Sequence, residues 1–465
     1  MDYSAADGNN LKGERDQLHV VMLPYFAFGH VLPFLELGRA LARRGHRVSL
    51  LAPAALLRRL PAPAGATPLL SFVALPPLPH LPASVSSTAD LPPRLRPLLQ
   101  KSLDSLRPFF AEFVAGCSPK PDFVVHDFAA YWAASSASLP AVFFSTFPAS
   151  TAAFFGRTNP ADFIGPPRWV PFPTAVAFRR HELLRIFLDS VLPNASGVPE
   201  SARLKMGLAG AAIVAQRSCP ELEPDWFPLL SGLHDRPVVP LGLLPSTQAA
   251  DGNLSADHPR IFEFLEAQKT GSAIYVALGS EAVLTAELLR ELALGLELSN
   301  VPFLWALRKP AGAEDAAALL PEGFEERTRP RGLVVTGWAP QVQVLGHDAV
   351  GAFLTHCGWS SVVEGLQHGR ALVLLPVCAD QGLNARAMAE KGVGVEVERD
   401  EDSGFFSRSA VAEAVRKVVA GEEGAKVRAK AKEVSKVVGD VEMQDKYVDG
   451  FVKCLKEHRA RESNI

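Results

Sequence analysis

The sequence predicts an α/β protein of two doubly wound domains, each a parallel sheet covered by helices, which face each other across a cleft. Two observations predict this fold class. Short apolar runs alternate with helical patterns along most of the chain, which is typical of βαβ units. The length of 465 residues also exceeds what one compact core commonly holds.

The first half opens with one complete βαβ unit. An apolar run with β-branched residues spans 17–26, a helical pattern follows over about 32–44, and a second apolar run covers 46–52. Two strands joined by a helix are parallel. Further strands of this half are predicted at 122–127, 141–146 and 211–216.

Proline-rich pieces interrupt this first half at 61–97 and 159–174. Proline supplies 38 residues of the chain, and it cannot continue a helix or a central strand. We therefore expect both pieces to be surface loops, where binding specificity tends to lie.

The second half repeats the alternation more cleanly. Its strands are predicted at 273–278, 303–308, 332–337, 351–356, 371–376 and 394–398. Its helices are predicted at 285–298, 361–368, 382–391, 408–420 and 424–438. Small and polar residues at 246–258 indicate a linker between a domain over 1–245 and a domain over 259–440.

Composition argues against several classes of protein. The net charge of -3 spreads over both halves without a basic stripe, so we expect no nucleic-acid partner. No stretch reaches the ~18 apolar residues that a membrane span needs, and the polar first sixteen residues do not resemble a signal peptide. The five cysteines have no metal-ligand spacing, which is typical of reduced thiols in a cytoplasmic protein.

The most informative segment is 338–381, which begins Trp-Ala-Pro-Gln and ends Asp-Gln. Ligands of doubly wound domains bind outside the carboxyl ends of the strands. His356 and Gly358 lie there, at a predicted strand-to-helix turn, followed by Ser360 and Ser361. The N–H groups and the positive dipole end of a helix N-terminus suit a diphosphate.

This 44-residue segment resembles the signature box of plant small-molecule UDP-glycosyltransferases. The likeness extends to PYFAFGH near the start, to LGS at 278–280 and to LWALR at 304–308. The resemblance implies a GT-B fold of two Rossmann-like domains, and transfer of a sugar from a UDP-sugar to a hydroxyl of a small molecule without a metal. Gln381 is usual in users of UDP-glucose, which we expect as the donor. The family default is a monomer whose C-terminal helix, here 441–465, packs back on the first domain.

The resemblance also implies a donor site at matching positions. Trp338 would stack on the uracil ring, and Glu364 would accept hydrogen bonds from both ribose hydroxyls. His356 would touch the phosphates, and Asp380 and Gln381 the sugar hydroxyls. The full set is Thr146, Ser280, Trp338, Ala339, Gln341, His356, Gly358, Trp359, Ser360, Ser361, Glu364, Asp380 and Gln381.

One position departs from the family pattern, because Ser360 stands where the family usually has Asn. Serine caps a helix well, but it is shorter and offers no amide donor, so we expect a weaker phosphate contact or a compensating water. The departure leaves open a protein that binds a UDP-sugar without turnover. Transfer of another sugar, such as rhamnose, xylose or galactose, is a second alternative.

The first half supplies a predicted catalytic pair. His30 opens the first helix, whose dipole disfavours an imidazolium, so a neutral ring is expected to act as a base. Asp127 ends a strand on the same carboxyl edge, where a carboxylate on the other ring nitrogen would fix the tautomer. His and Asp hold these roles in the family, which implies deprotonation of the acceptor by His30 and inversion at the anomeric carbon. Taken singly, His30 could be an ordinary helix-capping residue, and Asp127 could be a carboxylate in the turn at the end of a strand.

Aromatic residues of the first half are the candidates for acceptor binding. An aromatic lining suits flat or fused-ring molecules such as flavonoids and terpenoids, although phenylalanine is equally common in plain core. Stretches such as RSCPELEPD resemble a branch that often adds sugars to terpenoid or flavonoid glycosides. The candidates are Phe26, Phe28, Phe128 and Phe147.

Overall fold

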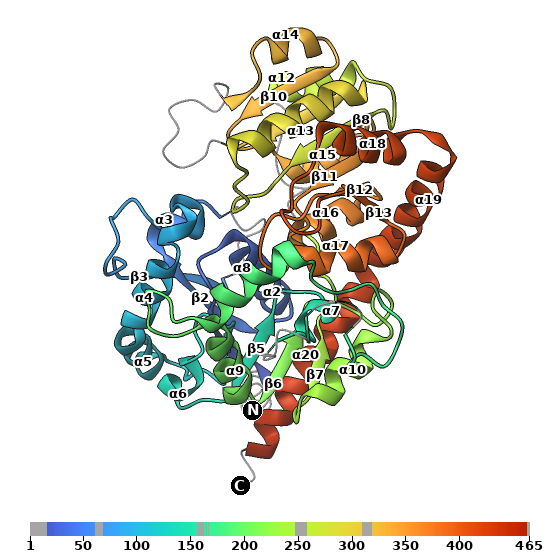
Figure 1. The fold of residues 1–465 in the computed structure, drawn as a ribbon. Helices are drawn as coiled ribbons and strands as arrows, with labels where there is room; N and C mark the ends of the chain where they lie inside the picture. The colour runs from blue at the N-terminus through green and yellow to red at the C-terminus, as the bar shows by residue number, and fades with distance from the viewer. Residues whose placement is uncertain are drawn as a thin grey trace, which may run out of the picture.

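The computed structural model describes residues 16–60, 68–155, 162–163, 165, 167–246, 258–308 and 319–462. Over these residues the chain forms two parallel sheets flanked by helices (Figure 1). The first sheet has the order β3-β2-β1-β4-β5-β6-β7, and the second has the order β10-β9-β8-β11-β12-β13. This architecture confirms the predicted fold class of two doubly wound domains.

The seven strands of the first sheet include five that the sequence predicts. They are β1 (His19–Leu23), β2 (Arg47–Pro53), β3 (Leu70–Leu75), β4 (Phe123–His126), β5 (Ala141–Ser145), β6 (Ile213–Gln216) and β7 (Val238–Pro240). Since β1 pairs with both β2 and β4, the strand order reverses beside it. Such a reversal is where doubly wound sheets bind ligands.

The prediction of an irregular loop over 61–97 is wrong at β3, which pairs in parallel with β2 along its whole length. The prolines of this piece lie on either side of 70–75, so they bound the strand instead of breaking it. Of the other predicted loop, 159–174, the structure describes residues 162–163, 165 and 167–174.

The second sheet contains all six predicted strands. They are β8 (Ala273–Ala277), β9 (Phe303–Leu307), β10 (Gly332–Thr336), β11 (Val350–Thr355), β12 (Ala371–Leu374) and β13 (Gly394–Glu396). The inner strands are buried on both faces and read as continuous apolar runs, as parallel strands between two helix layers do. The predicted linker lies almost wholly outside the described residues, so the domain boundaries stay predictions.

Helices cover both sheets (Figure 1). Those of the first half are α2 (Phe28–Arg43), α3 (Ala54–Leu57), α4 (Pro97–Ser105), α5 (Arg107–Gly116), α6 (Ala133–Ala137), α7 (Ala149–Ala152), α8 (Arg180–Val191), α9 (Glu200–Gly210) and α10 (Trp226–Leu233). Those of the second half are α12 (Pro259–Glu266), α13 (Ala286–Ser299), α14 (Phe324–Thr328), α15 (Gln341–Gly346), α16 (Trp359–Gln367), α17 (Gln381–Glu390), α18 (Arg408–Val419), α19 (Gly421–Val438) and α20 (Val441–Glu462). The first helix begins earlier than predicted, which places His30 within its first turn.

The last helix, α20, returns from the second sheet to the first (Figure 1). Arg44, the C-cap residue of α2, donates to Asp445 Oδ1 at 2.9 Å and to Asp449 Oδ1 at 2.5 Å. Arg459 donates to Asp122 Oδ1, just before β4, at 3.2 Å. These pairs hold α20 against the N-terminal domain.

The two domains meet through the loops at the carboxyl ends of their strands. Arg308 Nη2, after β9, donates to the carbonyl of Ala89 at 2.8 Å, and Thr88 bonds to Glu281, after β8. Thr151 Oγ1 donates to Asn384 Oδ1 at 2.7 Å on the other side of the seam. The carboxyl edges of both sheets therefore face one cleft, as the sequence predicts.

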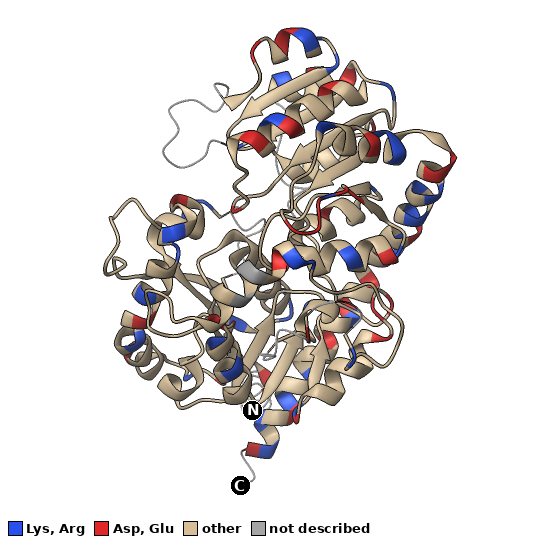
Figure 2. Ribbon diagram, viewed as in Figure 1, with Lys and Arg blue, Asp and Glu red and all other residues tan. Residues whose placement is uncertain are grey.

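Charged residues of both signs are interspersed along the ribbon of both domains in the view of Figure 2. Within the described ranges, no helix has the length and apolar character required to cross a bilayer.

Candidate active site

His30 and Asp127 lie together at the carboxyl edge of the first sheet. His30 Nδ1 is 2.9 Å from Asp127 Oδ2, which also accepts from the N–H of Tyr25 at 2.7 Å. Asp127 Oδ1 accepts from the N–H of Ala129 at 2.9 Å. Because the carboxylate accepts every bond, the network assigns the hydrogen to His30 Nδ1 and leaves Nε2 as the basic nitrogen.

The charge state of His30 reflects competing effects. Burial acts to lower the pKa of this imidazole, but the charge and hydrogen bond of Asp127, with Glu281 and Asp380 further away, raise it above its ordinary value. The helix dipole, on which the expectation of a neutral ring rests, is therefore one of several influences: burial also favours the neutral ring, and the carboxylates together outweigh burial. The nearby carboxylates stabilise an imidazolium, which is the form that a base reaches after taking a proton.

The surroundings of His30 are aromatic and partly open. Its side chain is 12% exposed, and its ring lies 5.5 Å from that of Phe128 and 5.6 Å from that of Phe147, between centroids. Thr146 Oγ1 is 3.3 Å from Nδ1. The geometry thus places two of the four acceptor candidates, and one donor candidate, beside the base.

The other two acceptor candidates lie differently. Phe26 has no exposed surface and packs within the core of the first domain, so its assignment to the acceptor is not supported by its position. Phe28 contacts Arg59, whose guanidinium carbon is 4.8 Å from the ring centroid, and its ring lies 6.0 Å from that of Trp338. Phe28 therefore lies beside Trp338, the residue predicted to stack on the uracil ring.

His356 occupies the turn between β11 and α16. Its ring lies against Gly279 and Gly358 so closely that a Cβ at either position would collide with it. Burial lowers the pKa of His356 to about 4, so the ring is neutral, and its Nδ1 is buried with no hydrogen-bond partner among the described residues. Gly358 is the N-cap of α16, and Ser280 directly follows Gly279. These groups converge at the N-terminus of α16, as a diphosphate site requires.

A substitution at Gly279 tests this end of the site. Gly279→Ala is expected to weaken UDP binding about tenfold, because the new methyl group would displace the His356 ring and remove a polar contact. Gly271→Ala is the matched control, since Gly271 has nearly the same backbone angle, φ +67 against +69, with nothing near its Cβ. Calorimetric titration of UDP compares the two variants. Equal affinities would contradict the assignment of His356 to the diphosphate.

The candidates for the base and ribose form a second group. Gln341 Nε2 donates to Glu364 Oε2 at 2.7 Å and to Ser361 Oγ at 3.3 Å. Burial raises the pKa of Glu364, while the Gln341 bond and the charge of Arg217 oppose this. Trp338 is 69% exposed at the rim, so a face of its indole is free for stacking. Ala339 beside it is buried.

The sugar candidates lie at the start of α17. Asp380 Oδ2 accepts from Asn384 Nδ2 at 2.6 Å. Burial raises the pKa of Asp380 to about 6, against the Asn384 bond and the charge of His30. Gln381 is held by its own turn, since its Oε1 accepts from the N–H groups of Val377 and Cys378 at 2.9 and 3.0 Å. Its carbonyl oxygen thus fixes the turn that carries Asp380.

A residue that the sequence reasoning did not select joins the site from the first domain. Arg217, directly after β6, donates from Nη1 to Ser360 Oγ at 2.8 Å. The indole N–H of Trp359 donates to the carbonyl of Arg217 at 3.0 Å, which gives the buried Trp359 a structural role between the domains. Only the packing of one domain on the other could reveal this residue.

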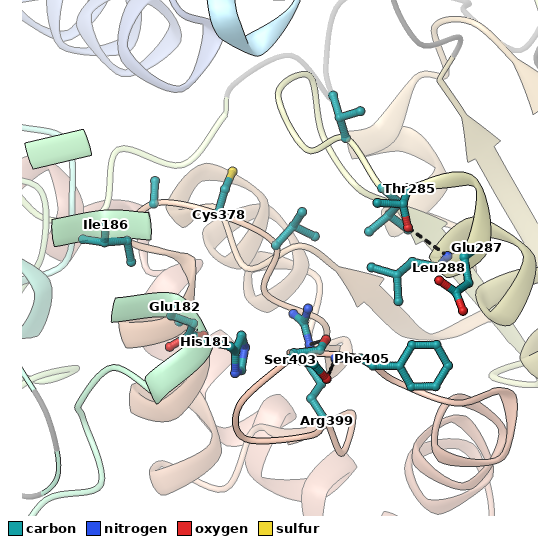
Figure 3. Close-up of a pocket in the computed structure, with 16 residues that line it drawn as sticks. His181, Glu182, Ile186, Thr285, Glu287, Leu288, Cys378, Arg399, Ser403 and Phe405 are labelled. Carbon is teal, nitrogen blue, oxygen red and sulfur yellow. Dashed lines mark hydrogen bonds between the residues drawn. The ribbon is translucent and has the colours of Figure 1, made fainter. Parts of the chain in front are cut away.

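A cavity of about 400 Å³ opens next to the Asp380 turn, between α8 and loops of the second domain (Figure 3). In Figure 3, His181 and Ile186 of α8 lie at the left of the cavity and Leu288 and Phe405 at the right. Arg399 and Ser403 lie next to His181, and Cys378 lies above them. Its lining mixes polar and apolar side chains. Among the residues that the structure describes, no three His, Cys, Asp or Glu side chains are grouped to hold a metal ion.

The chain is similar to known proteins along nearly its whole length. Residues 235–436 match the family model described as UDP-glucoronosyl and UDP-glucosyl transferase. UDP-glycosyltransferase 91C1 of Arabidopsis thaliana is 39% identical, over 96% of this chain and 98% of that protein. Soyasaponin III rhamnosyltransferase of Glycine max is 38% identical, over 99% of each chain. Phytolacca americana UGT2 complexed with UDP-2fluoro-glucose and pterostilbene is 26% identical, with a TM-score of 0.70, over 95% of this chain and 100% of that chain.

The two facing Rossmann-like domains define a transferase of the GT-B class. The chain belongs to the plant UDP-glycosyltransferase family, as its signature box predicts. Its members use a UDP-sugar donor and a small-molecule acceptor.

Proposed function

We propose that the protein transfers glucose from UDP-glucose to a hydroxyl of a small apolar plant metabolite, or of its glycoside, of terpenoid or flavonoid type. The reaction inverts the anomeric carbon and needs no metal. The observation that carries this proposal is the His30–Asp127 pair at 2.9 Å, in the cleft that the N-terminus of α16 also faces.

The chemistry is a single displacement. Nε2 of His30 takes the proton of the acceptor hydroxyl as its oxygen bonds to the anomeric carbon. The bond from that carbon to the phosphate oxygen breaks, and its electron pair leaves with UDP. Asp127 stabilises the imidazolium, while His356 and the N–H groups of α16 stabilise the charge on the diphosphate.

The identity of the sugar rests on Asp380 and Gln381. A carboxylate beside an amide offers acceptors and a donor to the hydroxyls of a hexose. The relatives include a protein named as a rhamnosyltransferase, so rhamnose is the alternative sugar that a specific observation favours.

The acceptor proposal rests on the aromatic rings beside His30 and on the cavity of Figure 3. Phe405 and Val283 at the cavity are 37% and 47% exposed, and Arg399 and Ser403 lie beside them. Apolar surface next to polar side chains suits a molecule with an apolar body and an attached sugar. A cytoplasmic location and a monomeric state stay predictions from the sequence.

Acceptor-dependent release of UDP tests the proposal. Phenolic, terpenoid and glycoside acceptors are offered with UDP-glucose, UDP-rhamnose, UDP-xylose or UDP-galactose, and mass spectrometry identifies the product. We expect release to be fastest with UDP-glucose, and the product formed from that donor to be the acceptor plus one hexosyl unit. Faster transfer from another donor would show that the protein uses that sugar and not glucose. Binding of UDP without release for any acceptor would favour the non-catalytic binder.

A further inference from the structure

Arg217 is a buried cation at the seam between the domains. Only 3% of the residue is exposed. Its Nε donates to the carbonyl of Leu243 at 2.9 Å and its Nη2 to that of Leu244 at 3.4 Å, which fixes the guanidinium on the first domain. Its Nη1 reaches across to Ser360 Oγ at 2.8 Å. One side chain thus joins the first domain to the first turn of α16.

The charge of Arg217 lies where the protein already carries partial positive charge. Burial lowers the pKa of Arg217 to about 10, so the group stays charged at neutral pH, while Glu364 and Glu36 act on it through charge. Within the described part of the chain, no carboxylate forms an ion pair with it. A cation beside a helix N-terminus is disfavoured by the helix dipole. The guanidinium and the helix end are therefore both complementary to an anion at the same place.

The hydrogen bond to Ser360 directs that serine toward the anion. A hydroxyl has one hydrogen to donate and lone pairs that accept. Because Arg217 donates to Ser360 Oγ, the hydroxyl hydrogen of Ser360 is left to donate elsewhere. A hydroxyl that accepts from a cation is polarised and is a stronger donor to a phosphate oxygen.

We propose that Arg217 is a positioning residue for the donor diphosphate, and that Arg217 and Ser360 together replace the amide donor of the usual Asn. Arg217 supplies a positive charge from the first domain and donates to Ser360. Ser360 in turn donates a hydrogen bond to the diphosphate at the N-terminus of α16. Since the contact crosses the seam, binding of the diphosphate also stabilises the closed arrangement of the two domains. This inference rests on the proposed function, in which α16 receives the diphosphate.

Binding of UDP and of uridine to the full chain tests the inference. Arg217→Gln and Ser360→Ala are each expected to weaken UDP binding about tenfold, the loss of one charge-assisted bond, and to leave uridine binding unchanged because uridine has no phosphate. The double variant is expected to lose no more than either single variant. Ser360→Asn, made in the Arg217→Gln background, is expected to regain most of the UDP affinity.

Arg203→Gln is the matched control, because Arg203 is a second buried arginine of the first domain, bonded at Nη1 to Asp104 Oδ1 at 3.0 Å. It is expected to lower the melting temperature without changing the ratio of UDP to uridine affinity. An unchanged ratio of UDP to uridine affinity in Ser360→Ala would overturn this inference and leave the proposed function standing. Losses of UDP affinity that add in the double variant would do the same. A wild-type protein that does not bind UDP would overturn the proposed function as well.

Discussion

Replacing His30 by alanine is expected to lower kcat/KM for sugar transfer by about 10³, within the range that general bases contribute. Within the described part of the chain, no other imidazole is bonded to Asp127 Oδ2, so the acceptor hydroxyl would lose the base that the mechanism assigns to it. UDP affinity is expected to stay nearly unchanged, since the contacts proposed for the diphosphate come from the second domain and Arg217. Steady-state kinetics and calorimetric titration of UDP measure the two quantities.

His458→Ala serves as the control for that variant, because His458 lies on α20 with its ring beside Phe123, outside the site. It is expected to transfer sugar at the wild-type rate. Sugar transfer at the wild-type rate by His30→Ala would show that His30 is not the general base.

Replacing Asp127 by asparagine is expected to cost about 10² to 10⁴ in kcat/KM, as loss of the orienting carboxylate does in hydrolase triads. An amide can donate to Nδ1 of His30, which would move the ring hydrogen to Nε2 and remove the basic nitrogen. The remaining carbonyl oxygen takes the place of Oδ1 and still accepts from the N–H of Ala129, whereas the N–H of Tyr25, which bonds to Oδ2, loses its acceptor. Loss of one such hydrogen bond costs about 1–3 kcal/mol, less than the usual stability of a folded domain, so circular dichroism should still show a folded protein.

The pH dependence of kcat/KM tests whether Asp127 sets the pKa of His30. The base must be unprotonated, so kcat/KM should fall as the pH drops through the pKa of His30, which Asp127 raises above its ordinary value of 6.5. Without that carboxylate, burial acts to lower the pKa, and the acid limb of the profile should move to lower pH in Asp127→Asn. Asp380 also titrates on this limb, with a pKa of about 6. In Asp380→Asn, the titration of Asp380 should disappear from the profile and that of His30 should remain. An acid limb that does not move in Asp127→Asn would show that Asp127 does not set the pKa of His30.

Much of the fold could be predicted from the sequence because the inner strands are buried on both faces and are apolar throughout. The two edge strands of the first sheet, β3 and β7, gave weaker signals. β3 is bounded by prolines, and β7 has only three residues and ends in Pro240. The start of α2 was misplaced because Ala27, its N-cap, makes no side-chain capping bond. A helix without a capping side chain shows no boundary in its sequence.

The candidate site divides in the same way. His356, Glu364 and Asp380 follow strands in one continuous segment, so topology and spacing bring them to one edge. The burial of Phe26 was not foreseen, because neighbouring aromatic residues in a sequence give no sign of which one enters the core. Arg217 was missed because its contact with Ser360 joins residues 143 positions apart in different domains. Such contacts depend on domain packing, which no local pattern encodes.

The configuration of the new glycosidic bond tests the displacement chemistry most directly. UDP-glucose carries its sugar in the α-linkage, so one displacement assisted by His30 yields a β-linked product, which proton magnetic resonance of the anomeric hydrogen identifies. We predict a β-glucoside from the wild-type protein. An α-linked product would contradict the mechanism, because retention requires a second displacement or attack from the side of the leaving group.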